Sequence, residues 1–472
     1  MLWRGGPTSV PNEGVWTTHE LSECLARRER VIRSSDLVTR RGHVTRVVGL
    51  LMESQGPEAE TGELVRVERA SSVTGAATPV LAEVVGFRDG RVLLLPLENT
   101  DRLTAGAVVT ATGRHLEVGC GTELLGRVFD GLGRPFDGRG PVRGVQWRSA
   151  EAPAPDPMTR PRIDQALPVG VRAIDGLLTC GKGQRLGIFA GSGVGKSTLL
   201  GMLCRHTAAD VAVVALVGER GREVGEFIER DLGPEGLARS VVVVATSDQP
   251  AVTRLKAPLV ATTIAEFFRD QGLDVLLVMD SLTRFALALR EAGLASGEPP
   301  TTRGYPPSVF AALPRLLERS GRSDRGSITG FYTVLVEGED MNEPIADAVR
   351  GLLDGHIVLS RDLAARGHYP AIDILTSISR LAGSVVDPEH RSAAQRVREV
   401  LSVYQHAEDL IDVGAYRTGS NASIDHAMRW IEPVRSFLRQ AQDQPADWSD
   451  TRRSLLALGS SSAAPSQGAE SA

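Results

Sequence analysis

The 472-residue sequence predicts an α/β protein with a mostly parallel sheet at its centre. Between about residues 168 and 381, continuous apolar runs alternate with helical segments, which is the pattern of buried parallel strands joined by crossover helices. Residues 37–113 instead carry short β-rich runs broken by Gly, Asp and Asn, and these runs indicate a small barrel or sandwich. Residues 390–440 read as helices.

Changes in composition along the chain predict five segments, with a proline-rich linker near residues 150–165 inside the third. The expected segments are an N-terminal segment (1–34), a β-barrel domain (35–115), an α/β domain (116–385), a helical domain (386–445) and a disordered tail (446–472). Residues 25–33 of the first segment are basic, and they predict either a solvated short helix or a contact surface.

The individual strands follow from short runs of apolar residues. In the barrel domain the runs are VTRVVGLLM, ELVRV, PVLAEVVGF, GRVLLLPL and AVVTATG, in chain order. In the α/β domain the apolar runs cover residues 186–190, 211–218, 240–246, 274–280 and 327–336. Because these five runs are apolar throughout, we expect strands that are buried on both faces of the sheet.

Composition excludes several classes of protein. The net charge of −5 argues against a protein whose main partner is a nucleic acid. No apolar run approaches the ~20 residues of a membrane helix, and the first residues lack the apolar core of a signal peptide, so we expect a cytoplasmic protein. The four cysteines form no CxxC pair, which argues against a disulfide framework or a zinc site.

The strongest local motif is AGSGVGKST, residues 190–198, which fits the P-loop pattern except that Ala190 replaces the first glycine. It follows an apolar strand and precedes a helical run, as the motif requires. We expect Lys196 to reach the β- and γ-phosphates of ATP and the Ser197 hydroxyl to ligate Mg²⁺. The predicted phosphate cradle comprises Gly191, Ser192, Gly193, Val194, Gly195, Lys196, Ser197 and Thr198.

Two acidic residues follow buried strands of the same domain. Asp280 ends an apolar run and is expected beside the P-loop, where its carboxylate would hold Mg²⁺ directly or through water. Taken alone, an acid at this position is as often a helix cap. Glu219 follows the run 211–218 and is a candidate for activating water, although a solvated loop glutamate would look the same.

Several longer segments together resemble one family, the type III protein-export ATPases, which are related to the catalytic subunits of rotary ATP synthases. The segments include GRVFDGLGRPFDG, GVRAIDGLLTCGKGQRLGIFAGSGVGKSTLLGML, GERGREVGEFIERDLG, DGHIVLSRDLAARGHYPAIDILTSISR and EDLIDVGAY. The resemblance covers roughly residues 35–440 and is far more specific than the P-loop alone.

The resemblance implies a β-barrel, a RecA-like nucleotide domain and a C-terminal helical domain. It further implies a homohexameric ring with ATP and Mg²⁺ at subunit interfaces, in which hydrolysis promotes chaperone release, unfolding and export of substrates. Such a ring would lie in the cytoplasm, peripheral to the inner membrane, and contact an export gate. The N-terminal segment would bind a stator-like regulator.

The resemblance also assigns roles to single residues. Glu219 would position the attacking water, and the neighbouring Arg220 would contact phosphate. Arg380, which closes the SISR segment, would be an arginine finger that reaches the next subunit. Tyr369 would pack on the adenine. From residue type alone, we would expect Arg380 to form an ion pair on the surface and Tyr369 to pack in the core.

The presence of both Glu219 and Arg380 in one chain favours a ring of identical subunits, because each copy can complete its neighbour's site. The P-loop and the EDLIDVGAY segment resemble flagellar members more than injectisome members, and the injectisome remains the alternative. More distant alternatives are a rotary synthase subunit and an RNA-translocating hexamer. Acidic net charge and only 4% aromatic residues argue against RNA as a partner.

Overall fold

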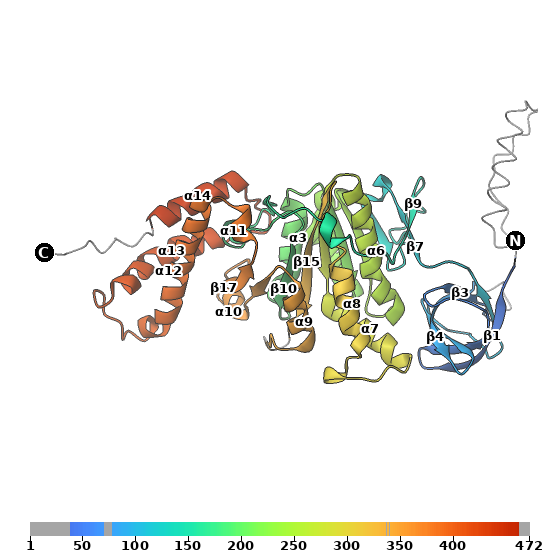
Figure 1. Cartoon of the computed structure of the whole chain (residues 1–472). Helices are drawn as coiled ribbons and strands as arrows, with labels where there is room; N and C mark the ends of the chain where they lie inside the picture. The colour runs from blue at the N-terminus through green and yellow to red at the C-terminus, as the bar shows by residue number, and fades with distance from the viewer. Residues whose placement is uncertain (1–37, 70–77, 337, 339, 462–472) are drawn as a thin grey trace, which may run out of the picture.

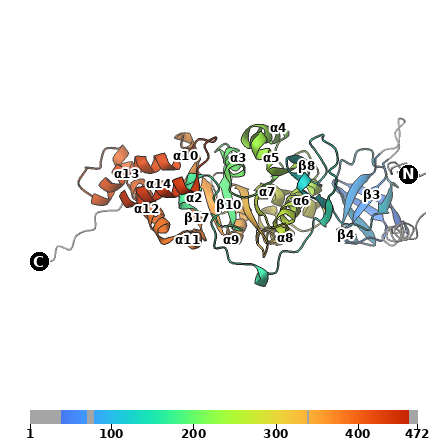
Figure 2. The same ribbon diagram turned by 90° about the horizontal axis from the view of Figure 1, so that it is seen from above.

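A computed structural model describes residues 38–69, 78–336, 338 and 340–461. The expected N-terminal segment 1–34 and residues 462–472 of the expected tail lie outside the described residues. The described chain is elongated, with the barrel at one end, the sheet and its helices in the middle and a group of helices at the other end (Figure 1; Figure 2). This architecture confirms the predicted fold class.

The N-terminal domain is a closed barrel with the strand order β1-β2-β5-β4-β3-β6. Its strands are β1 (Arg41–Val48), β2 (Leu51–Gln55), β3 (Leu64–Val67), β4 (Val80–Arg88), β5 (Arg91–Pro96) and β6 (Val108–Ala111). The run VTRVVGLLM forms two strands rather than one, because Gly49 adopts a φ of 58° and turns the chain back on itself.

The central domain is built on a nine-stranded sheet in which β14 pairs with β15 and the other strands follow the order β17-β16-β10-β15-β13-β11-β12-β8. All of its pairs are parallel except β16 with β17 and β14 with β15. The strands are β8 (Arg127–Asp130), β10 (Arg185–Ala190), β11 (Val211–Val217), β12 (Ser240–Ala245), β13 (Asp274–Asp280), β14 (Gly321–Arg322), β15 (Ser327–Leu335), β16 (Gly355–Leu359) and β17 (Ile372–Ser379). A separate two-stranded sheet pairs β7 (Glu117–Cys120) with β9 (Gln146–Ser149).

Helices cover both faces of this sheet, so that it separates two hydrophobic cores. Val213 and Val214 are neighbours on β11 but belong to different cores, because successive side chains of a strand point to opposite faces. The helices of the central domain are α2 (Arg172–Leu177), α3 (Lys196–His206), α4 (Gly221–Glu226), the π-helical η3 (Phe227–Leu232), α5 (Gly233–Ala238), α6 (Ala251–Asp270), α7 (Leu282–Ala295), α8 (Pro307–Leu317), α9 (Pro344–Leu352), α10 (Arg361–Ala365) and α11 (Ala382–Val385), with 3₁₀ turns η1 (Thr122–Leu124), η2 (Pro157–Thr159) and η4 (Thr302–Gly304).

The C-terminal domain consists of α12 (Pro388–Asp412), α13 (Ala422–Leu438) and α14 (Trp448–Ser461). The prediction of a disordered tail from residue 446 is therefore wrong for residues 448–461. Leu455 is fully buried, and the Trp448 ring stacks on His390 of α12 with the ring centroids 5.7 Å apart. Gly459 lets α14 approach α12 closely, since a Cβ atom at this position would lie 2.5 Å from that of Ala393.

A buried ion pair joins the barrel to the central domain. Lys256 of α6 is only 3% exposed, and its Nζ lies 2.7 Å from Glu83 Oε1 on β4 and 2.6 Å from Glu151 Oε1 in the linker region. The hydroxyl of Thr253, one turn earlier, donates to the carbonyl of Leu97 in the barrel. Within the described part of the chain, no helix is long and apolar enough to cross a membrane.

Candidate active site

The sheet brings the predicted site residues to one edge. The P-loop follows β10, Glu219 follows β11, and Asp280 is the last residue of β13. These strands run parallel with β15 between β10 and β13, so their carboxyl ends meet on the same side of the sheet. In the register of β11 with β13, Leu216 is paired with Asp280, which places Glu219 just beyond the acid of the neighbouring strand.

The P-loop has the backbone geometry of a phosphate cradle. Gly193 and Gly195 adopt φ angles of 78° and 90°, which non-glycine residues rarely adopt, and α3 begins directly after them at Lys196. Ser192, Gly193 and Ser197 are exposed, so the loop is open to a ligand. Peptide N–H groups at the start of an eleven-residue helix favour an anion at this point.

Lys196 links the two acids of the site. Its Nζ donates to Asp280 Oδ1 at 2.6 Å and to Glu219 Oε1 at 3.4 Å. Burial of the ammonium group opposes protonation, but the carboxylates of Asp280 and Glu219 outweigh it, and the pKa of Lys196 is raised. Lys196 is therefore charged, and in this arrangement its ammonium group lies between the two acids of the site.

Burial dominates the chemistry of Glu219. The residue is 8% exposed, and its Oε2 lies 3.3 Å from Arg284 Nη2. Burial raises the pKa of Glu219 to about 7, although the Lys196 ammonium lowers it, and Asp280 and a hydrogen bond with Glu223 raise it further. A carboxyl group with a pKa near neutrality can both accept and release a proton, which suits a general base.

The oxygen donors of the site suit a magnesium ion. Ser197 presents its hydroxyl in the first turn of α3, and Asp280, 3% exposed, accepts a hydrogen bond of 2.7 Å from the Thr333 hydroxyl. Mg²⁺ prefers one or two protein oxygens together with phosphate and water oxygens. Among the described residues there is no group of three or more His, Cys, Asp or Glu side chains placed to hold a metal by themselves.

The remaining predicted residues lie around this centre. The Arg220 side chain is 75% exposed and lies 3.7 Å from Glu223. Tyr369 is half exposed, and its ring lies against the P-loop, since a Cβ atom on Gly195 would be 3.5 Å from two of its carbons. An exposed ring beside the phosphate cradle is placed to stack on a nucleotide base.

Arg380 lies apart from the other site residues. It follows β17, the edge strand, which is five strands away from β11 in the sheet order. At ~4.8 Å between strands this separation is about 24 Å, more than three times the length of an arginine side chain. Arg380 is exposed, and no side-chain hydrogen bond or ion pair joins it to another described residue. It is therefore out of reach of Glu219 in its own chain.

Three further residues belong to the site but were not predicted. Arg284 contacts Glu219, Thr333 contacts Asp280, and the Arg361 guanidinium lies against the P-loop, 2.9 Å from where a Cβ atom on Gly191 would sit. Arg284 carried a usable signal, because a residue four positions after a strand-end acid lies one helical turn away and on the same edge. Thr333 and Arg361 depend on strand order, which the sequence alone does not reveal.

Family models match three successive parts of the chain. The ATP synthase alpha/beta family matches with its beta-barrel domain over residues 44–113 and with its nucleotide-binding domain over residues 170–379. The T3SS EscN ATPase C-terminal domain matches residues 386–457, which include most of α14. The matches thus follow the three structural domains.

Relatives and solved structures match over nearly the full length. The flagellum-specific ATP synthase of Bacillus subtilis is 54% identical over 90% of this chain and 97% of its own length. The type 3 secretion system ATPase of Sinorhizobium fredii is 50% identical over 94% of this chain and 98% of its own. The assembled ATPase EscN from the type III secretion system of enteropathogenic E. coli superposes with a TM-score of 0.83 at 46% identity, covering 89% of this chain and 100% of that one.

Proposed function

This chain belongs to the type III secretion branch of the ATP synthase alpha/beta family, and we propose that it hydrolyses ATP in a homohexameric ring that energises flagellar protein export. The proposal of a ring depends on one observation. Within one chain, Arg380 follows β17 and Glu219 follows β11, five strands away in the sheet, which is a separation of about 24 Å. β17 runs antiparallel to β16, and its Ser379 pairs with Gly355 at the start of β16, so Arg380 also lies at the opposite end of the strands from the P-loop. A finger that cannot reach its own nucleotide serves the nucleotide of a neighbouring copy. The related EscN was likewise solved as an assembled ATPase, which supports a ring of copies.

The site residues divide the reaction between them. Lys196 turns from Asp280 toward the β- and γ-phosphates, and the P-loop amides hold the phosphate oxygens. Ser197 and Asp280 would hold Mg²⁺, which would supply positive charge to neutralise the phosphates. Glu219 orients a water molecule toward the γ-phosphorus and accepts its proton as the bond to ADP breaks. Arg380 of the next subunit stabilises the charge of the transition state, and Arg220 contacts phosphate.

The ring would work at the cytoplasmic side of the inner membrane, as a peripheral component of the export apparatus. Its partners there would be the export gate, a stator-like regulator at residues 1–34, and chaperones with their export substrates. A related structure shows EscN in complex with its central stalk EscO, which supports a dedicated protein partner for the ring. No part of the proposal involves nucleic acid.

The injectisome is the second candidate, because type 3 secretion system ATPases of Sinorhizobium fredii and Xanthomonas euvesicatoria are 50% and 51% identical to this chain. The flagellar assignment is supported by the 54% identity to the Bacillus subtilis relative and by the AGSGVGKS form of the P-loop.

A deletion of the gene in the source organism tests both assignments. The strain is complemented with the wild type, with Lys196→Ala, or with Lys182→Arg, a control that keeps its ion pair with Asp274. Filament assembly and the profile of secreted proteins are scored together. We expect filaments to be lost and to return with the wild type and the control only.

The other outcomes are equally informative. Intact filaments with a different set of secreted proteins missing would assign the chain to an injectisome. Full rescue by Lys196→Ala would contradict the proposal that ATP hydrolysis drives export.

A further inference from the structure

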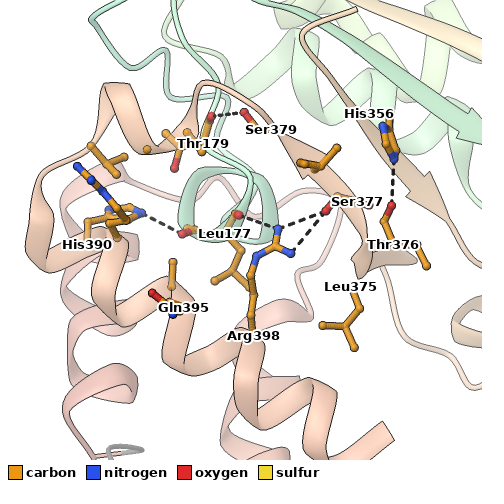
Figure 3. Close-up of a pocket in the computed structure, with 17 residues that line it drawn as sticks. Leu177, Thr179, His356, Leu375, Thr376, Ser377, Ser379, His390, Gln395 and Arg398 are labelled. Carbon is orange, nitrogen blue, oxygen red and sulfur yellow. Dashed lines mark hydrogen bonds between the residues drawn. The ribbon is translucent and has the colours of Figure 1, made fainter. Parts of the chain in front are cut away.

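The backbone around Arg380 borders open space. Arg380 lies in the turn between β17 and α11, and the four residues of α11 are all partly or fully exposed. A cavity of about 560 Å³ lies beside this turn, and Ser379, Ala382 and Gly383 are among the residues that line it (Figure 3). Because side chains do not pack against the turn on this side, its position depends largely on hydrogen bonds.

The residue before Arg380 is fastened to two buried partners. The Ser379 hydroxyl donates to the carbonyl oxygen of Thr179, 3.0 Å away, as Figure 3 shows. It also accepts a hydrogen bond of 3.0 Å from Gln184 Nε2. Thr179 is 1% exposed and Gln184 is fully buried, so both partners belong to the interior of the central domain. The hydroxyl thus ties the end of β17 to the residue that precedes β10.

Gln184 also bonds to the backbone group that holds Arg380 itself. The Arg380 N–H donates to the carbonyl oxygen of Asp354 at 3.0 Å, and the same oxygen accepts a bond of 3.3 Å from Gln184 Nε2. Gln184 Oε1 accepts from the N–H of Gly181 at 2.8 Å, which fixes the orientation of the amide. Both hydrogen bonds that this amide nitrogen donates therefore support the backbone on which Arg380 is carried.

Asp354 is itself held by the start of β10. The backbone N–H and the Nε of Arg185 donate to Asp354 Oδ2 at 3.0 and 3.2 Å. Gly355, the next residue, lets β17 lie close, since a Cβ atom there would be 2.4 Å from the carbonyl oxygen of Ile378. The base of Arg380 is therefore attached to one end of β10, and the P-loop of the same chain follows the other end.

We propose that Gln184 is a positioning residue for the arginine finger. Through Ser379 and Asp354 it holds the backbone of Arg380, so that the guanidinium enters the neighbouring ATP site in the geometry that hydrolysis requires. The inference rests on the trans role of Arg380 in the proposed function and adds the residue that orients the finger. A misplacement of about 1 Å in an active site can cost about a hundredfold in rate. Loss of the Gln184 amide should therefore slow hydrolysis in the neighbour's site and spare ATP binding in its own chain.

Kinetics of the isolated variants give the first test. Gln184→Leu keeps the approximate size of the side chain and removes its three hydrogen bonds. We expect kcat to fall by about tenfold to a hundredfold, while ATP binding, measured by fluorescence titration, stays within about threefold of wild type. A defect in the fold of the central domain would instead weaken ATP binding as well.

Ser379 provides a second pair of variants on the exposed side of the same contact. Ser379→Ala should lower kcat as Gln184→Leu does, whereas Ser379→Thr keeps the hydroxyl and should stay within about threefold of wild type. Ser377→Ala is the matched control, because this buried hydroxyl of β17 bonds to the backbone of Asp373 and Val358 and not to that of Arg380. Thermal melting identifies any variant that does not fold, and the Ser379 variants carry the test if Gln184→Leu is one of them.

Mixing separates an effect on the finger from an effect on the variant's own site. In a one-to-one mixture with Lys196→Ala, about a quarter of the interfaces pair the intact P-loop of Gln184→Leu with the correctly held finger of Lys196→Ala, and hydrolysis should recover toward that fraction. In a mixture with Arg380→Ala every finger is missing or misplaced, so hydrolysis should not exceed the mean of the two proteins alone.

The outcomes distinguish this inference from the proposed function. If Arg380→Ala and Lys196→Ala restore hydrolysis to each other, then recovery of Gln184→Leu with Arg380→Ala, or none with Lys196→Ala, would overturn the positioning role and leave the finger in place. Wild-type kcat in folded Gln184→Leu and Ser379→Ala would overturn it too. If Arg380→Ala and Lys196→Ala exchange subunits and stay inactive, the trans role fails and the positioning role fails with it.

Discussion

Glu219 owes its chemistry to its surroundings rather than to its residue type. Burial pushes its pKa upward, while the ammonium of Lys196 and the guanidinium of Arg284 favour its ionised form. Residue type and position after a strand were enough to select Glu219 and Asp280 as candidates. The contacts that tune them come from β13, α7 and β15, which are separated in sequence, and these contacts could not be predicted without the strand order.

Replacing Glu219 by Gln keeps the size of the side chain but removes the base. We expect kcat to fall by about a hundredfold or more, because a positioned base commonly contributes 10²–10⁴ to a hydrolytic rate. ATP binding, measured by fluorescence titration, should stay within a few fold of wild type. Glu223→Gln, one helical turn away and more exposed, is the matched comparison. Equal losses in both variants would contradict a special role for Glu219.

The pH dependence of kcat/KM should report the same carboxyl group. The pKa of Glu219 is raised to about 7 by burial first, and a hydrogen bond with Glu223 adds to the effect. Below that pH the base is protonated, so kcat/KM should rise as pH increases through about 7, measured between about pH 5.5 and 9. Glu223→Ala removes one cause of the raised pKa and should move the inflection to lower pH. A flat profile across neutrality would contradict the assignment.

At the scale of elements, the sequence predicted the buried strands well and α14 not at all. The runs at 211–218 and 274–280 are apolar on both faces, and they form β11 and β13 with shifts of one residue at most. The helix at 448–461 was not predicted, because the Ser/Ala-rich residues that follow it made the whole stretch from residue 446 resemble a disordered tail. Its signals were present: Asp447 Oδ1 accepts hydrogen bonds from the N–H groups of Ser449 and Asp450, and Leu455 provides the apolar face.

Leu455→Ala should show that α14 is part of the folded C-terminal domain. Truncating a fully buried leucine usually costs about 2–5 kcal/mol of the free energy of unfolding. We expect the cost to appear as faster amide hydrogen exchange in α12 and α14, because the side chain packs in their shared core. Ser454→Ala, exposed on the same helix, should leave exchange unchanged. Unaltered exchange in Leu455→Ala would mean that α14 is not docked in solution.

In the whole molecule, the order of strands in the sheet determines whether Arg380 and Glu219 of one chain can act in the same ATP site. The sequence identified Arg380 only through resemblance, and it could not show that the arginine lies on the far edge of the sheet from Glu219. Strand order places it there, because among the described strands β17 pairs only with β16, at the end of the sheet. The same order explains why the P-loop, Glu219 and Asp280 meet although they are far apart in the sequence.

Mixing two inactive variants tests the ring directly. Lys196→Ala and Arg380→Ala should each be nearly inactive, since one loses the phosphate contact and the other the finger. In freely exchanging one-to-one mixtures, about a quarter of the interfaces pair an intact P-loop with an intact finger, and hydrolysis should recover toward that fraction. Each variant alone, at the same total protein concentration, is the control. Mixtures that exchange subunits and remain inactive would contradict the trans role.

The three lysines of this chain, against fifty arginines, all lie in ion pairs: Lys182 with Asp274, Lys196 with Asp280, and Lys256 with Glu83 and Glu151. A lysine-specific endoprotease can therefore cleave this chain at three internal positions, and at each of them the lysine is held in an ion pair. Cleavage after Lys256 requires that α6 separate from the barrel, and cleavage after Lys196 requires that the phosphate loop open. The rates of cleavage after Lys256 and after Lys196, measured with and without nucleotide, would report separately on the opening of the barrel junction and of the active site.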